Sequence, residues 1–116
     1  MSVGASRRIR RAAHAAQAQA VLNEVGAADL AALQAPGQPH PSIKGLQVLS
    51  RPRQANVLRC WLRLQCHASA SAAQLEELLD QLDACRTRGH QIQIKVGHGF
   101  VRRNMDRLDW YNPGFT

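Results

Sequence analysis

Three prolines and one glycine stand within residues 35–42, and this cluster constrains the fold more than any other feature of the 116-residue chain. Proline lacks an amide proton and has a fixed φ, so such a segment excludes both a helix and a central strand. We therefore predict a Pro/Gly linker at residues 36–42. It separates an N-terminal arm, residues 1–35, from a core, residues 43–116, and the chain is long enough for one domain overall.

The arm is rich in alanine and begins with a run of arginines. Alanine is the best helix former, so we expect a helix from about residue 7 to residue 25, with Ser6 as its cap. Gly26 should interrupt this helix before one or two further turns. Because alanine buries little apolar area, most of the core should come from the Leu, Ile and Val clusters after residue 42.

Residues 56–67 show the strongest strand pattern. Apolar and polar side chains alternate there with a period of two, which is typical of a half-buried strand. The pattern places Trp61 on one face, between Arg59 and Arg63. The opposite, inward face would hold Leu58, Cys60, Leu62, Leu64 and Cys66. A shorter strand is expected at residues 44–50.

Residues 71–89 carry the clearest helix signal. Ser71 and Gln74 match a capping box, and Gly89 stands where a glycine commonly ends a helix. One face of this helix would be apolar at helical spacing, with Leu75, Leu78, Leu79, Leu82 and Cys85.

Residues 91–96 alternate again, and Lys95 should point outward between inward-facing Ile94 and Val96. Strand, helix and strand in this order imply a right-handed βαβ unit. The predicted fold class is α+β: a small ββαβ sheet with one amphipathic helix on one face, plus an N-terminal Ala-rich helical segment. In the tail that follows, Asn104 is expected to cap a short helix that carries Met105 and Leu108.

The chain is strongly basic, with 15 Lys and Arg against eight Asp and Glu. Four of the acidic residues lie in the predicted helix at 71–89, so outside it 13 basic residues face four acidic ones. A positive field of this kind attracts polyanions or acidic protein surfaces.

Three basic surfaces are candidate binding sites for nucleic acid or another partner. A sheet face that presents an aromatic ring among cations can stack a base and hold phosphates. Arginine clusters and Trp, Tyr and Arg at a chain end are also typical of binding surfaces. The candidates are Arg59, Trp61, Arg63 and Lys95 on the sheet face; Arg7, Arg8, Arg10 and Arg11 on the arm; and Arg102, Arg103, Trp110 and Tyr111 in the tail.

Each surface also has a purely structural interpretation. The Ala-rich helix could pack over the sheet face and bury Trp61, or a second copy of the chain could pair there. The arginines of the arm could form a solvated helix end, and Trp110 could fold back to complete the core.

Catalytic and metal sites find little support. The five histidines are scattered without ligand spacing, and the three cysteines face the predicted core, so no metal site and no cofactor are expected. A small ribonuclease that uses His98, Arg102 and Tyr111 is compatible with the spacing, but nothing in the sequence requires it.

The sequence therefore predicts a non-enzymatic basic protein that binds nucleic acid, RNA or single strands more than duplex DNA. The alternative is an inhibitor or adaptor that docks on an acidic or nucleic-acid-binding surface of a larger machine, and a homodimer is possible. The odd number of cysteines without a Cys-x-x-Cys motif favours a reducing cytoplasm. The N-terminus lacks the pattern of a signal peptide, and no run of apolar residues is long enough to span a membrane.

Overall fold

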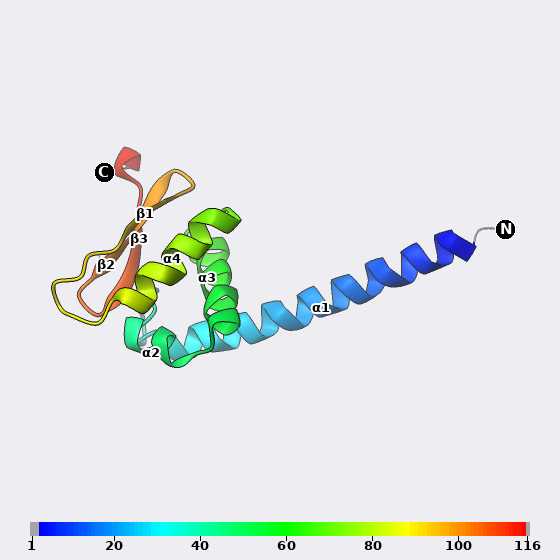
Figure 1. The fold of residues 1–116 in the computed structure, drawn as a ribbon, viewed down its shortest axis with the longest axis horizontal. Helices are drawn as coiled ribbons and strands as arrows, with labels where there is room; N and C mark the ends of the chain where they lie inside the picture. The colour runs from blue at the N-terminus through cyan, green and yellow to red at the C-terminus, as the bar shows by residue number, and fades with distance from the viewer. Residues whose placement is uncertain (1–2, 116) are drawn as a thin grey trace.

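The computed structural model describes the backbone of residues 3–115 and the side chains of residues 10–114. Four helices precede a three-stranded antiparallel sheet in this part of the chain (Figure 1). The predicted α+β class is confirmed. The predicted ββαβ order is wrong, because all four α-helices come before the three strands, with α4 ending at Ala84 and β1 beginning at Gln93. The elements are α1 (Val3–Leu33), α2 (Ile43–Val48), α3 (Arg51–Gln65), α4 (Ala72–Ala84), β1 (Gln93–Val96), β2 (Gly99–Asn104), β3 (Arg107–Tyr111) and the 3-10 helix η1 (Pro113–Phe115).

The largest error concerns residues 56–67, which belong almost entirely to helix α3 and form no strand. Pro52 stands in the first turn of α3, where its missing amide proton leaves no helical hydrogen bond unmade. Leu58, Trp61 and Leu62 are all buried, at helical spacing, whereas Leu64 is 51% exposed. The buried face is therefore a helical stripe, and the apparent period of two is a coincidence of the apolar positions.

The strand predicted at residues 44–50 is also helical. Ser42 caps α2, because its Oγ accepts a hydrogen bond from the amide of Gly45 at 3.1 Å. Ile43 and Leu46 are the buried residues of this short helix. A serine directly before an apolar residue is a helix-start signal that the short apolar run obscured.

Helix α4 forms as predicted. The Ser71 Oγ accepts from the amide of Gln74 at 3.1 Å, and the Gln74 side chain accepts from the amide of Ser71 at 2.9 Å. The helix ends at Ala84, with Cys85 as its C-cap, so Gly89 does not terminate it. The apolar stripe is buried as expected, at Leu75, Leu78, Leu79 and Leu82.

Two tight hairpins build the sheet in the order β1-β2-β3. Val96 pairs with Gly99 across one turn, and Asn104 pairs with Arg107 across the other. The predicted alternation in β1 is confirmed, since Lys95 is exposed between buried neighbours. The short helix expected after Asn104 is wrong, because Met105 adopts φ 58° in the second turn and the chain returns as β3.

Helix α1 continues without interruption through Gly26, contrary to the prediction. A Cβ at Gly26 would lie 3.2 Å from Nδ2 of Asn56 and 3.3 Å from Cβ of Cys60. The glycine therefore allows α1 to approach α3 closely. Arg53 of α3 also binds Asp29 of α1, with an Nη2–Oδ1 distance of 2.7 Å.

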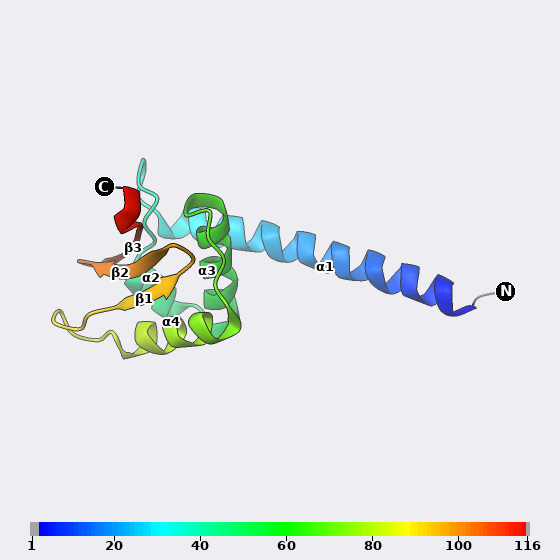
Figure 2. The same ribbon diagram turned by 90° about the horizontal axis from the view of Figure 1, so that it is seen from above.

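The N-terminal part of α1 projects away from the body of the molecule (Figures 1 and 2). This projection explains the long axis of 63 Å, against 31 and 27 Å for the other two. Helix α1 packs on α3. The interpretation in which this Ala-rich helix covers the sheet is therefore wrong.

The segment between α1 and α2 ties the helices to the sheet. The amide of Leu108 donates to the Pro41 carbonyl at 3.0 Å, and the amide of Ile43 donates to the Asp106 carbonyl at 2.9 Å. Arg107 Nη1 donates to the carbonyls of Leu33 and His40. These hydrogen bonds hold the segment before α2, and the first residue of α2, against the hairpin formed by β2 and β3.

Gly99 gives a test of the sheet packing. A Cβ there would overlap the carbonyl oxygen of Tyr111 and the ring of Trp110. We predict that Gly99→Ala lowers the free energy of unfolding by about 1–3 kcal/mol. Urea denaturation measures this change. Gly89→Ala is the control, because a Cβ at Gly89 has no heavy atom within 4 Å; equal losses in both variants would contradict the packing described.

Candidate nucleic-acid interface

Trp61, the predicted centre of a binding face, is a core residue. It is only 1% exposed and lies in α3 among the other buried side chains. It cannot stack on a base without unfolding of the domain, so this prediction is wrong. Arg59 and Arg63, its neighbours in the sequence, are exposed on α3 and line a small hollow against α1.

The sheet has one open face, which the register defines. Directly paired residues of neighbouring strands place their side chains on the same face. Gln93 pairs with Arg102, which pairs with Asp109, and the next row is Lys95, Phe100 and Tyr111. We call this surface the outer sheet face. The opposite face carries Ile94, Val96, Val101 and Leu108 and belongs to the core.

An aromatic pair lies on the outer sheet face. The rings of Phe100 and Tyr111 are stacked, with centroids 5.6 Å apart and planes 27° apart. The guanidinium carbon of Arg102 lies 4.2 Å from the centroid of the Tyr111 ring. The face therefore combines flat rings with a cation, as the sequence led us to expect, but with different residues.

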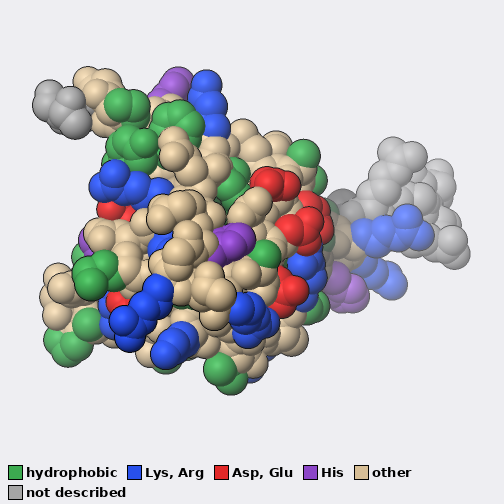
Figure 3. Space-filling model, turned by 60° about the vertical axis from the view of Figure 1, so that its left-hand side comes forward, with side chains coloured by type: hydrophobic (Ala, Val, Ile, Leu, Met, Phe, Trp, Pro, Cys, Tyr) green, Lys and Arg blue, Asp and Glu red, His purple; other side chains and the backbone are tan. Residues whose placement is uncertain are grey.

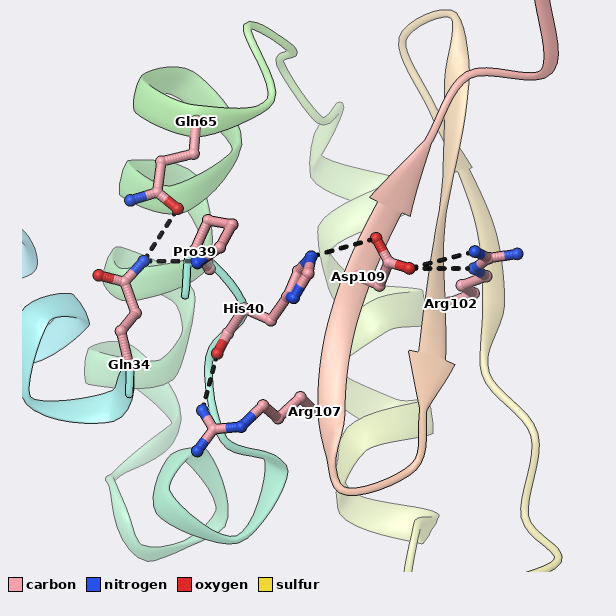
Figure 4. A network of polar contacts seen from close by, with 7 residues as sticks. All are labelled: Gln34, Pro39, His40, Gln65, Arg102, Arg107 and Asp109. Carbon is pink, nitrogen blue, oxygen red and sulfur yellow. Dashed lines mark hydrogen bonds and ion pairs between the residues drawn. The ribbon is translucent and has the colours of Figure 1, made fainter. Parts of the chain in front are cut away.

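Asp109 holds Arg102 in this position. Its Oδ2 accepts from Nε and Nη2 of Arg102 at 3.3 and 3.2 Å, and its Oδ1 lies 3.5 Å from Nε2 of His40 (Figure 4). Asp109 is buried, so its charge is weakly screened by solvent. The carboxylate thus fixes the guanidinium over the ring and reduces the freedom that Arg102 would lose on binding.

His40 in turn comes from the segment between α1 and α2, which further polar contacts hold in place. Gln34 donates to the Pro39 carbonyl and to Oε1 of Gln65, both at 2.9 Å (Figure 4). A continuous set of contacts therefore runs from the end of α1 to the outer sheet face.

A polar hollow of about 480 Å³ borders the outer sheet face. It lies beside the edge of the sheet and includes Arg102 and Tyr111 in its walls. Its other lining residues are Gln91, Ile92, Gln93, Arg103 and Asn104.

Two residues predicted for the tail surface make internal contacts. Arg103 donates to the carbonyls of Met105, Thr87 and His90 at 2.6, 2.6 and 2.8 Å. Trp110 is half-buried against the core, and its Nε1 donates to the Val96 carbonyl at 3.2 Å. Both side chains hold the sheet and its loops together, as the structural interpretation of Trp110 suggested.

The basic arm lies on the projecting part of α1. Arg10 and Arg11 are exposed there, and the side chains of Arg7 and Arg8 lie outside the described residues. Among residues 10–114, neither Arg10 nor Arg11 has an acidic partner within 4 Å. The arm is thus available to a polyanion but is remote from the sheet (Figure 2).

The acidic residues of α4 form a separate surface. Glu76 and Asp80 both bind Arg51 of α3 at 2.8 Å. Figure 3 shows most acidic side chains on one side of the view and a group of Lys and Arg side chains across its lower part. On the face shown in Figure 3, acidic and basic side chains are thus largely separated, as inferred from the sequence.

Phe100 was missed as a site residue. The signal was present, because the short turns after Val96 and Asn104 define a strand in which Phe100 and Arg102 share one face. Reading residues 101–108 as an unstructured tail and a helix concealed that alternation.

The sequence of this chain matches one protein-family model over more than half of its length. The model described as the TilS substrate binding domain matches residues 42–108, which contain α2 to β2 and the start of β3. The chain belongs to the TilS substrate binding domain family. The matched range contains α2, α3, α4, β1 and β2 but only the first two residues of β3, so Asp109, Tyr111 and all of α1 lie outside it.

Curated relatives agree with this assignment. A tRNA(Ile)-lysidine synthase of Polaromonas naphthalenivorans (strain CJ2) is 64% identical over 94 residues, which cover 81% of this chain and 27% of the relative. The enzyme of the same name from Burkholderia pseudomallei (strain K96243) is 36% identical over 87% of this chain and 20% of the relative. One from Ralstonia nicotianae (strain ATCC BAA-1114 / GMI1000) is 40% identical over 69% of this chain and 17% of the relative.

The chain thus spans about a quarter or less of the length of these relatives. The prediction of a non-enzymatic protein is wrong, because the chain matches a substrate-binding region of proteins named tRNA(Ile)-lysidine synthase. Within residues 3–115, no helix is long and apolar enough to cross a membrane. No group of three or more His, Cys, Asp or Glu in the described residues is placed to hold a metal ion.

Cys66 allows a test of the packing beneath the interface. Burial, with a smaller contribution from the charge of Asp109, raises the pKa of its thiol to about 12. In the unfolded chain the thiol ionises near its ordinary pKa of 9.0, whereas in the folded domain it stays protonated. The contribution of this shift to stability is therefore complete below about pH 9 and is lost as the pH rises toward 12.

We predict that the free energy of unfolding of the wild type falls with pH between about 9 and 10.5, at up to about 1.4 kcal/mol per pH unit from this group. Cys66→Ala removes this contribution and gives a flatter dependence, whatever its stability at pH 7. Urea denaturation of both proteins across this range measures the two slopes. Parallel curves would show that the thiol is not shielded in the folded domain.

Proposed function

We propose that this domain binds the tRNA substrate of a tRNA(Ile)-lysidine synthase through the outer sheet face. The observation that carries the proposal is the Phe100–Tyr111 pair with Arg102 over the Tyr111 ring, on the three-stranded sheet of a domain in the substrate-binding family. The lysidine-forming reaction itself belongs, in this proposal, to the remainder of a longer chain, because the relatives are about four to six times longer than this match.

The chemistry of the outer sheet face suits unpaired nucleotides. Bases stack on aromatic side chains, and such stacking contributes roughly 1–3 kcal/mol per base. Arg102 and the exposed Lys95 would lie next to a stacked base and reach its phosphates. RNA loops, whose bases can be splayed out, fit such a surface better than a regular duplex does.

The exposed arginines of the arm and of α3 would add contacts to phosphates. Arg10 and Arg11 project on α1, while Arg59 and Arg63 border it on α3. Because these residues are separate from the sheet, we assign them a supporting, sequence-independent role. Arg103 and Trp110 support the interface from within.

Family membership and the cysteines also bear on the predicted partner and cellular compartment. Membership of a substrate-binding family favours RNA over the inhibitor or adaptor alternative. The three cysteines are free, which supports a reducing compartment such as the cytoplasm.

Tyr111→Leu tests the proposal. It removes the stacking surface and the Arg102 contact while keeping an apolar side chain. We predict that the affinity for a tRNA(Ile) transcript falls about tenfold, which corresponds to the loss of roughly one stacked base. Fluorescence anisotropy at constant salt measures the affinity, and circular dichroism confirms folding.

The matched control is Leu64→Ala, an apolar truncation at an exposed position of α3 away from the sheet. It should leave the affinity within twofold of the wild type. If Tyr111→Leu binds tRNA as tightly as Leu64→Ala does, the outer sheet face is not the binding surface.

A further inference from the structure

Besides the polar hollow next to the outer sheet face, a basic hollow lies between α2 and the segment that joins α4 to β1. It has a volume of about 460 Å³. Four basic side chains and one acidic side chain line it: Lys44, Arg86, Arg88 and Arg103, with Asp106. Lys44, Arg86 and Arg88 were not among the site residues predicted from the sequence, and they lie outside the outer sheet face.

Two of these cations are unpaired. Lys44 and Arg88 are exposed and have no ion pair or side-chain hydrogen bond among the described residues. Arg86 is held by Asp83, with an Nη2–Oδ1 distance of 3.1 Å, and its Nε donates to the Asp83 carbonyl. The hollow therefore presents two free cations beside a third that is fixed in place.

Internal hydrogen bonds give the hollow a fixed frame. Arg103 binds the carbonyls of Thr87 and His90, which holds the segment that carries Arg86 and Arg88 against β2. On the other wall, Nε2 of Gln47 donates to the carbonyls of Leu82 and Cys85 at 2.9 and 2.8 Å. These bonds join α2 to the end of α4 and occupy carbonyl oxygens that would repel an anion.

Arg103 also connects this hollow with the outer sheet face. It lines both the basic hollow and the polar hollow that contains Arg102 and Tyr111. A chain of phosphates that leaves the aromatic pair past Arg102 would thus meet Arg103 and then the unpaired cations. Two hollows that share Arg103 suit an extended polyanion better than a small isolated anion.

We infer that this basic hollow is a second contact site for the phosphodiester backbone of the RNA bound at the outer sheet face, with Lys44 and Arg88 as the phosphate ligands. The inference rests on the proposed function. Lysine and arginine side chains that reach phosphates contribute affinity without base specificity, and each contact adds to the salt dependence. Asp106 opposes an anion at one wall, but the basic residues outnumber it four to one.

The test is the double variant Lys44→Gln/Arg88→Gln, titrated with a tRNA(Ile) transcript at several salt concentrations. The control is Arg51→Gln/Arg53→Gln, which removes the same charge from residues already paired with acids. Because Lys44 and Arg88 are exposed, circular dichroism and the melting temperature should match those of the wild type. The affinity of the double variant should fall about tenfold near 0.1 M salt, and its slope of log K against log salt should be smaller by about 1.5.

Three outcomes are distinguishable. Weaker binding and a smaller slope in Lys44→Gln/Arg88→Gln, with near-wild-type values in the control, support the inference. Equal affinities and slopes in the two double variants overturn the inference and leave tRNA binding at the sheet intact. Absence of tRNA binding by the wild type overturns the proposed function and the inference with it.

Discussion

The burial of α3 between α1, α4 and the sheet is the interaction on which the rest of this structure depends. Trp61 is almost fully excluded from solvent at the centre of this helix, and Leu58 and Leu62 flank it along the same buried face. Without that helix, the C-terminal part of α1 would lose the surface on which it packs, and α4, which contacts β1, would lose its neighbour on the other side. Truncation of a buried side chain of this size costs about 3–5 kcal/mol, a large part of the stability of a small domain. Trp61, which the sequence predicted as a binding residue, therefore stabilises the core and is not accessible to a ligand.

Because Trp61 is buried, the candidate interface lies in the last third of the chain, on β1, β2 and β3. Because the inner face of the sheet packs on the helices, Gln93, Lys95 and Arg102 on the opposite face are exposed to solvent, whereas Asp109 of β3 on that face is buried. The two tight turns fix the register that brings Phe100, Arg102 and Tyr111 together. Asp109 then orients Arg102, and the segment that carries His40 connects the arrangement to the helices. The interface is thus a product of tertiary packing, with no single sequence motif behind it.

The sequence was informative where local chemistry decides the structure. The capping box of Ser71 and Gln74 and the alternation around Lys95 were both correctly interpreted. Residues 56–67 misled because Leu58, Cys60 and Leu62 fit a period of two. The same residues form a helical stripe together with Val57 and Trp61, and only the packing partners distinguish the two patterns. The idea of a sheet face with a ring among cations was sound, but its residues could not be found without the correct strands. Whether an arginine is bound within the domain, like Arg103, or free, like Arg88, depends on contacts between residues distant in the sequence. The sequence alone could not predict this difference.

The central claim is that RNA meets the outer sheet face and not the helical core. Chemical-shift mapping of the isotope-labelled domain during titration with a tRNA(Ile) transcript tests it most directly. The account predicts that the largest shifts occur at Lys95, Phe100, Arg102 and Tyr111, while the indole signal of Trp61 stays within the experimental error. Shifts confined to α1 and α3, with an unperturbed sheet, would contradict it.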